Sequence, residues 1–113
     1  MATSKYTLLV THQAQQDIRT AKAYYRTQLA GLEKRFLRAV RQTLVQLQNH
    51  PFSAPVRFGE AAAGESPEMQ VRGAVVSGFP FIIYYLPEET TRTLTVLSVF
   101  HTFQNPAHLQ SQP

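Results

Sequence analysis

The sequence predicts an α+β fold in which a helical hairpin covers one face of a small, mainly antiparallel sheet, with elements in the order β-α-α-β-β-β. Three observations support this fold. Two apolar stripes at helical spacing occupy the first half of the chain, and a segment rich in proline and glycine follows them. The second half then carries three runs of β-branched and aromatic residues.

The first two expected elements are a strand and a helix that follow each other directly. Residues 5–11, KYTLLVT, have the composition of a short strand. Thr11 is suited to cap the helix, and the charges of Asp17 and Arg26, near its two ends, are favourable toward the helix dipole. The apolar stripe of this helix recurs at intervals of four, three and four residues and consists of Ala14, Ile18, Ala21 and Tyr25.

A second helix is expected from about residue 32 to residue 48. Gly31 suits a tight connection before it, and Pro51 ends it because the residue before a proline is driven away from helical angles. Two helices separated by so little chain should pack as an antiparallel hairpin. The apolar stripe of the second helix repeats at three, four and three residues and consists of Leu37, Val40, Leu44 and Leu47.

Three strands are expected after a connector over residues 51–67, which holds three prolines and two glycines. We expect this connector to be a loop, with at most a helical turn around residues 60–63. The strands should cover residues 69–76, 81–86 and 93–100. The middle strand, FIIYYL, is apolar on both faces, which predicts a central position in the sheet.

The length predicts a single domain over residues 1–113, with a core at 5–104 and a flexible tail at 105–113. A chain of 113 residues that is 43% apolar can form a core without a metal or a disulfide. It contains no cysteine, which excludes disulfide scaffolds and thiol nucleophiles and suits a reducing compartment. The longest apolar stretch, residues 79–86, is too short to span a membrane. We therefore expect a cytoplasmic protein without a membrane segment or a cofactor.

Charge is unevenly distributed along the chain. Residues 1–58 carry 9 basic and 2 acidic residues, a net charge of +7, whereas residues 59–113 carry 2 basic and 5 acidic residues, a net charge of −3. A basic half favours an anionic partner, either nucleic acid or an acidic protein. A solvated helix face would show the same charge, so the pattern alone leaves both interpretations open.

Five cations are candidates for binding such a partner. Lys34, Arg38 and Arg41 fall on one strip of the second helix, where they can grip an acidic segment or phosphates, or simply keep the helix soluble. Arg72 interrupts an apolar strand and should project from one of its faces. Arg57, in the connector, is placed to join it.

His101 is the candidate acid–base residue, because imidazole titrates near neutral pH. It follows the last strand directly and should share a side with Leu97 and Val99 by strand alternation. A half-buried histidine that closes the edge of the core would show the same pattern. No two histidines have metal-ligand spacing, and the sequence has neither paired carboxylates on one element nor a glycine-rich phosphate loop.

Five motifs occur in a fixed order along residues 5–106. They are QxDI at 15–18, a second helix of the type FLRAVRQTLVQLQNHP, an arginine-bearing strand at 71–73, GFPFIIYYL at 78–86, and LTVLSVFH ending at 101. This ordered set resembles the RelE/ParE superfamily of bacterial toxins from type II toxin–antitoxin systems. The resemblance is greatest to the ParE, or plasmid-stabilisation, branch.

The resemblance implies a toxin that inhibits DNA gyrase by binding it and is neutralised by a cognate antitoxin. It also leaves open a RelE-like endoribonuclease that cleaves mRNA on the ribosome, with His101, Arg72 and Tyr85 acting on the RNA. Two departures concern these functions. Gln104 stands where the branch usually has arginine, which favours a third possibility, a non-toxic interaction domain. After residue 59, Arg72 and Arg92 are the only cations, which are few for RNA cleavage.

Overall fold

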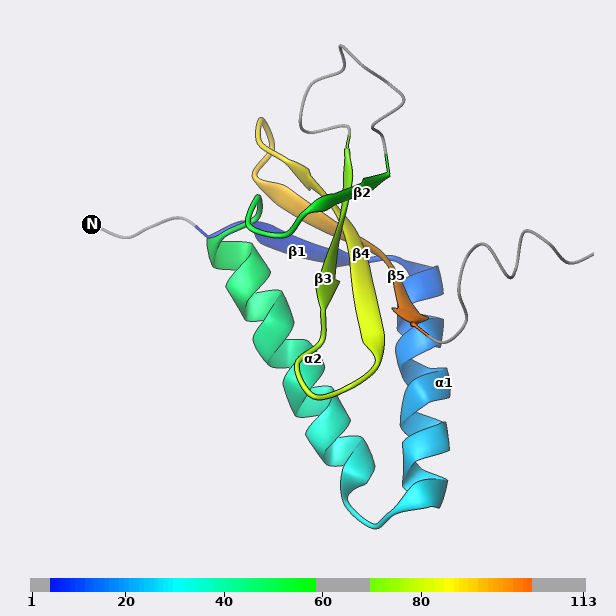
Figure 1. Ribbon diagram of the computed structural model, residues 1–113. Helices are drawn as coiled ribbons and strands as arrows, with labels where there is room; N and C mark the ends of the chain where they lie inside the picture. Colours follow the sequence, from blue (N-terminus) through cyan, green and yellow to red (C-terminus); the bar gives the residue numbers. More distant parts are fainter. Residues whose placement is uncertain (1–4, 59–69, 103–113) are drawn as a thin grey trace, which may run out of the picture.

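The protein consists of two helices packed against a five-stranded sheet (Figure 1), and the computed structural model describes residues 5–58 and 70–102. This architecture confirms the α+β prediction and the order of the predicted elements. In chain order the elements are β1 (Thr7–Val10), α1 (His12–Gln28), α2 (Leu32–Asn49), β2 (Val56–Phe58), β3 (Val71–Val75), β4 (Phe81–Glu88) and β5 (Thr93–His101).

The five strands form one mixed sheet in the order β1-β5-β4-β3-β2. β4 lies at its centre, as the two-sided apolar character of FIIYYL predicted. β1 runs parallel to β5, with Thr7 opposite Thr93 and Val10 opposite Val96, whereas the other neighbours are antiparallel. The first and last strands of the fold therefore lie side by side.

Thr11 begins α1, as expected, and also fastens the helix to the sheet. Its hydroxyl oxygen accepts a hydrogen bond from the Ala14 N–H at 3.2 Å, and its hydroxyl donates to the Val96 carbonyl at 2.9 Å. At the other end of the hairpin, Gly31 has a φ of 84°, a conformation that costs a residue with a Cβ more than it costs glycine. Thr11 and Gly31 thus act as the helix boundaries that the sequence predicts, and α2 ends at Asn49, shortly before Pro51.

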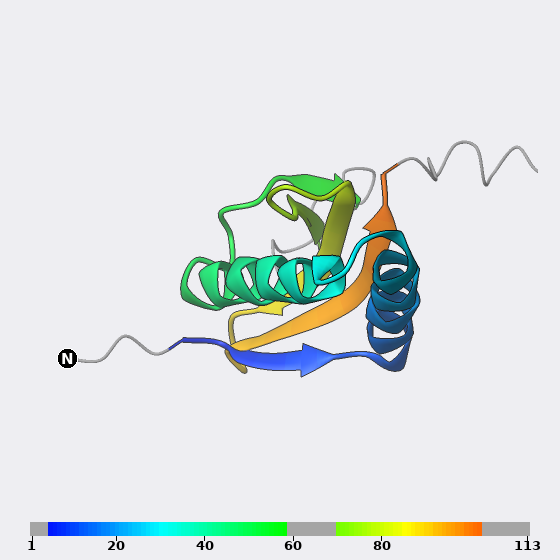
Figure 2. The same cartoon turned by 90° about the horizontal axis from the view of Figure 1, so that it is seen from below.

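The core lies between the helices and the concave side of the sheet, which curves around α2 (Figure 2). Phe36 of α2 is fully buried, and its ring centroid lies 5.2 Å from those of both Tyr25 and Phe81. Burial of large apolar and aromatic side chains is the main source of folding free energy in a protein of this size. Among the described residues, neither helix is long and apolar enough to cross a membrane.

The connector differs from its prediction as a loop, because Val56–Phe58 form β2 at the edge of the sheet. Val56 pairs with Arg72 and Phe58 with Val71, and the register shifts between them. Three residues after Pro55 give too short a pattern for a strand assignment, and this strand forms by pairing with its neighbour β3. The helical turn predicted at residues 60–63 and the tail at 105–113 lie outside the described residues.

A β-bulge in β5 decides where the last residues of the sheet point. Tyr84 pairs with Ser98 and Tyr85 with Val96, so Leu97 is an extra residue on β5. Val96 and Val99, three residues apart, are consequently both buried against the helices. The predicted alternation holds between Val99 and His101 but not back to Leu97, because the bulge interrupts it.

Candidate functional site

The strip of cations predicted on the second helix lies on the outward face of α2. Lys34, Arg38 and Arg41 are all exposed, and they follow one another at four and three residues, opposite the buried side of the helix. No ion pair joins them to another described residue. The exposed Val45 continues the strip by one turn, with 41% of its surface accessible. We call these four residues the α2 strip.

The whole hairpin is electropositive around this strip. Residues 12–49 contain seven lysines and arginines and two acidic residues, a net charge of +5. Both acids are engaged: Glu33 faces Arg26 at 3.9 Å, and Asp17 accepts two hydrogen bonds described below. The charge left for a partner is therefore positive, which attracts acidic macromolecules over a distance of about 10 Å at moderate salt.

The side chain of Arg72 binds the segment after α2, residues 52–54, and holds it against the sheet. One guanidinium nitrogen, Nη1, donates to the Ala54 carbonyl at 2.7 Å and to the Phe52 carbonyl at 3.2 Å, and the guanidinium carbon lies 5.1 Å from the centroid of the Phe52 ring. Tyr85, opposite Arg72 on β4, donates its hydroxyl to the Pro51 carbonyl at 2.7 Å. Burial raises the pKa of the Tyr85 hydroxyl, which is therefore neutral and a donor at physiological pH.

The structure does not bring Arg57 to Arg72. Arg72 lies on the same side of the sheet as the buried Tyr85, whereas the side chain of Arg57 runs across the neighbouring Gly73 on the opposite side. A Cβ on Gly73 would lie only 2.7 Å from the Arg57 Cγ. The two arginines predicted to act together thus occupy opposite faces, because Val56 and not Arg57 pairs with Arg72.

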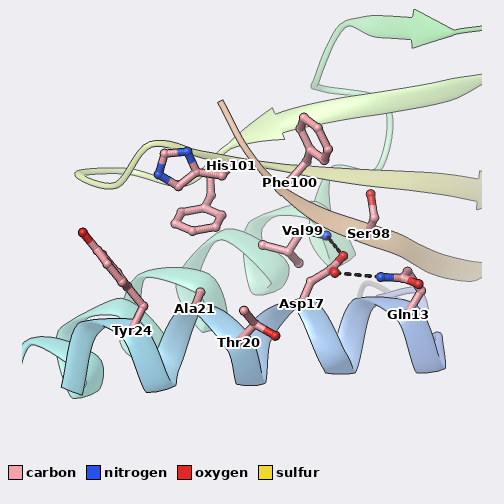
Figure 3. A pocket seen from close by; sticks show the side chains of 10 residues that line it. Gln13, Asp17, Thr20, Ala21, Tyr24, Ser98, Val99, Phe100 and His101 are labelled. Atoms are coloured by element: carbon pink, nitrogen blue, oxygen red, sulfur yellow. Dashed lines mark hydrogen bonds between the residues drawn. The ribbon is translucent and has the colours of Figure 1, made fainter. Parts of the chain in front are cut away.

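An apolar groove of about 650 Å³ lies between α1 and the last residues of β5 (Figure 3). It forms because β1 ends at Val10 and pairs with β5 only as far as Val96, so that α1 faces the remaining edge of β5. We call it the α1–β5 groove. Its lining consists of Gln13, Asp17, Thr20, Ala21, Tyr24, Phe81, Ser98, Val99, Phe100 and His101.

Asp17 bridges the two walls of this groove. One carboxylate oxygen, Oδ2, accepts the backbone N–H of Val99 at 3.0 Å, and the other accepts the side-chain amide of Gln13 at 2.8 Å (Figure 3). The carboxylate thereby satisfies a strand-edge donor that has no neighbouring strand. Sequence reasoning assigned Asp17 to the helix dipole; its position on the flank of the apolar stripe was the available signal for a contact with the sheet.

Asp17→Ala is expected to lower the free energy of unfolding by about 1.5–3 kcal/mol, because it leaves the Val99 N–H without a charged acceptor. Urea unfolding followed by circular dichroism measures this change. Gln13→Ala is the matched control: it removes an exposed partner of the same carboxylate and should change stability by less than about 0.5 kcal/mol. A loss for Asp17→Ala no larger than for Gln13→Ala would contradict the bridging role.

The three residues considered for RNA cleavage do not converge. Arg72 and Tyr85 are cross-strand neighbours. His101 is opposite Phe81 and packs edge-on against its ring at 4.9 Å, with its side chain in the α1–β5 groove. Phe81 and Tyr85 are four residues apart on β4, about 13 Å at the usual rise of a strand. Within the described residues, no three histidine, aspartate or glutamate side chains could together hold a metal ion.

Comparison with solved structures identifies this fold. A chain of the chromosomal ParDE toxin–antitoxin system from P. aeruginosa superposes with a TM-score of 0.62 at 19% identity, over 88% of this chain and 98% of that one. A chain of the toxin–antitoxin complex RelBE2 from Mycobacterium tuberculosis superposes with a TM-score of 0.59 at 21% identity, over 86% and 98%. No curated protein matches the sequence.

Both solved chains share this arrangement of two helices on a sheet, and at 19% and 21% identity they show a common fold. A sequence model for the ParE toxin of type II toxin–antitoxin systems, parDE, matches residues 8–106. The chain therefore belongs to the ParE toxin family. The match covers every described helix and strand except the first residue of β1.

Proposed function

We propose that this protein is a toxin that inhibits DNA gyrase by binding it, and that a cognate antitoxin neutralises it in the bacterial cytoplasm. Membership of the ParE toxin family supports the target. The single structural observation that carries the binding mode is the α2 strip, whose cations are exposed, aligned and unpaired with other described residues. Such a face binds an acidic surface without bond chemistry.

The α1–β5 groove is the proposed site for part of the antitoxin. It combines an apolar floor with an open strand edge, which suits an amphipathic segment that becomes ordered as it binds. The positive hairpin beside it favours an acidic segment. An antitoxin that fills this groove and extends along the hairpin would cover the α2 strip and so block the target.

The alternative function is that of a RelE-like endoribonuclease. The structural likeness to the RelBE2 chain is the reason to consider it. Cleavage through a 2′-hydroxyl needs a base, an acid and cations at one phosphate. The Arg72 guanidinium instead holds two backbone carbonyls, and the neutral Tyr85 hydroxyl donates to a third. His101 lies opposite Phe81, four residues along β4 from Tyr85. This arrangement favours binding over catalysis.

Supercoiling of relaxed plasmid by purified gyrase tests the proposal. We expect the protein to reduce supercoiling in proportion to its concentration, and the co-purified antitoxin to restore it. Full supercoiling at a large molar excess of folded toxin would contradict gyrase as the target. Arrest of growth on expression in a bacterial host, without any effect on gyrase, would show a toxin with another target.

Toeprinting on translating ribosomes tests the alternative function, and His101→Ala tests the site. We expect no mRNA cleavage from the wild type. If cleavage occurs and His101→Ala abolishes it while the variant stays folded, the protein is an endoribonuclease that uses the groove residue. Cleavage that survives His101→Ala would place the catalytic groups elsewhere.

A further inference from the structure

The side of the sheet opposite the helices presents an apolar surface. On β4 the residues Phe81, Ile83 and Tyr85 are buried toward the helices, so the alternate residues Ile82, Tyr84 and Leu86 point the other way. Cross-strand pairing adds Leu9, Val75 and Phe100 to this side. Val75 is 60% and Leu9 is 55% exposed, which is high for large aliphatic side chains.

The strand register makes these residues one continuous patch. Phe100, Ile82 and Val75 form one row across β5, β4 and β3, and the Tyr84 and Phe100 ring centroids lie 6.3 Å apart. Leu9 and Leu86 flank Thr95 in a second row across β1, β5 and β4. We call these six residues, together with Arg57, the outer sheet face. Contiguous apolar patches on a protein surface mark interaction sites when they are large and rimmed by polar residues.

Arg57, on β2 beside these rows, is the one cation of the outer sheet face as defined here, and the fold holds it in place. Its side chain fills the space that the missing side chain of Gly73 leaves between β2 and β4, with the Arg57 Nε only 3.1 Å and the Cγ 2.7 Å from where a Cβ would be. Gly73 is directly opposite Tyr84, so the arginine lies beside the apolar patch. Arg57 is exposed, and no hydrogen bond or ion pair joins it to another described residue.

We infer that the outer sheet face is a second docking surface, for an acidic, apolar segment of a partner protein whose carboxylate pairs with Arg57. A guanidinium that is unpaired with other described residues, at the border of an apolar patch, matches a carboxylate flanked by apolar side chains. Phe100 and Ser98 line the α1–β5 groove as well, so the groove and this surface meet at the edge of β5. The assignment of this segment to the antitoxin rests on the proposed function. The chemistry of the segment is inferred from the surface itself and is independent of that function.

The composition of the surface favours a peptide over a nucleic acid. Binding of single strands uses several cations along the backbone and ring faces open to the bases. The outer sheet face has one cation, and its two aromatic rings are half-buried and tilted by 54° against each other. An apolar segment with one carboxylate complements both the six apolar residues and Arg57.

The probe is a fluorescein-labelled amphipathic peptide of about 12 residues, long enough to cross four strands, with one aspartate in the middle of its apolar side. The comparison peptide carries lysine in place of the aspartate. Anisotropy titrations against the full chain should show that the aspartate peptide binds at least about threefold more tightly, and that salt near 1 M removes the difference. Amide shifts in NMR spectra should fall on β3, β4 and β5.

Three variants locate the site. Arg57→Ala should abolish the preference for the aspartate peptide. Val75→Asp, at an exposed position, should weaken the binding of the aspartate peptide, because the new carboxylate repels that of the peptide. Arg19→Ala removes an exposed arginine from α1 and should change nothing. Equal binding of both peptides, or shifts confined to the helices, would overturn the inference. So would tighter, Arg57-dependent binding of an oligo-dT strand, or a dimer in sedimentation that Val75→Asp dissociates.

Failure of this test is distinguishable from failure of the proposed function. If the protein binds the aspartate peptide through Arg57 but leaves gyrase active, the docking surface is supported and gyrase as the target is contradicted. If the protein inhibits gyrase but binds both peptides equally, gyrase as the target is supported and the docking surface is contradicted.

Discussion

Arg72→Ala is expected to lower the free energy of unfolding by about 2–4 kcal/mol, measured by urea unfolding. The substitution removes the donor of the Ala54 and Phe52 carbonyls and the cation packed against the Phe52 ring. The segment that leads from α2 to β2 would then keep the Tyr85 hydrogen bond to Pro51, the backbone bond from Gly73 to Pro55 and the burial of Ala54. Arg72→Lys should recover less than half of the loss, because an ammonium group lacks the planar shape that contacts a ring and two carbonyls together.

A double-mutant cycle with Tyr85→Phe checks this account. Tyr85→Phe removes one hydrogen bond to the Pro51 carbonyl and should cost about 1 kcal/mol. Since both side chains fasten the same segment, the double variant should lose less than the sum of the two single losses. Arg19→Ala serves as the control for the removal of an exposed arginine and should stay within about 0.5 kcal/mol of the wild type. If Arg72→Ala changes the free energy of unfolding as little as this control does, the contacts of Arg72 do not contribute to stability.

Reversal of two charges on the α2 strip should have the largest effect on the proposed activity. We expect the double variant Arg38→Glu, Arg41→Glu to need at least about tenfold more protein for half-maximal inhibition of gyrase, because it opposes an acidic partner at the centre of the contact. The melting temperature should change little, since both side chains are exposed and unpaired with other described residues.

The matched control reverses the same amount of charge elsewhere on the hairpin. Arg19→Glu with Lys22→Glu on α1 gives the same net charge as the α2 double variant. If attraction depended on net charge alone, both double variants would lose inhibition equally, and the α2 strip would have no special role. A loss confined to the α2 variant would locate the contact. Titration of each double variant with the antitoxin, followed by its binding affinity, then shows whether the α2 strip also binds the antitoxin.

The helices and the centre of the sheet could be predicted from sequence because their determinants are local. Thr11 caps α1 through its own hydroxyl, and Gly31 adopts the left-handed conformation between the helices. The alternation along β4 reports burial on one side and packing on the other. In each case the residues that signal the element also form the contacts that stabilise it.

The remaining features depend on neighbours that are distant in sequence. Among the described residues β2 pairs only with β3, and the bulge at Leu97 is visible only against the register of β4. Asp17 contacts a backbone N–H 82 positions later, and Arg57 fills a space that exists because residue 73 is glycine. None of these contacts leaves a periodic trace in the sequence. The candidate cations on α2 could be found because helical spacing alone places them on one face.

The pairing of β1 with β5 has a consequence for the order in which the chain can fold. β5 lies between β1 and β4, so without it β1 has no strand to pair with and the buried Leu94, Val96 and Val99 are missing from the core. During synthesis, β1 and both helices leave the ribosome long before β5 does. The sheet must therefore close after translation has passed residue 101, in a late step that joins the two ends of the fold. Amide protons of β1 and β5 should gain protection together in pulsed hydrogen exchange.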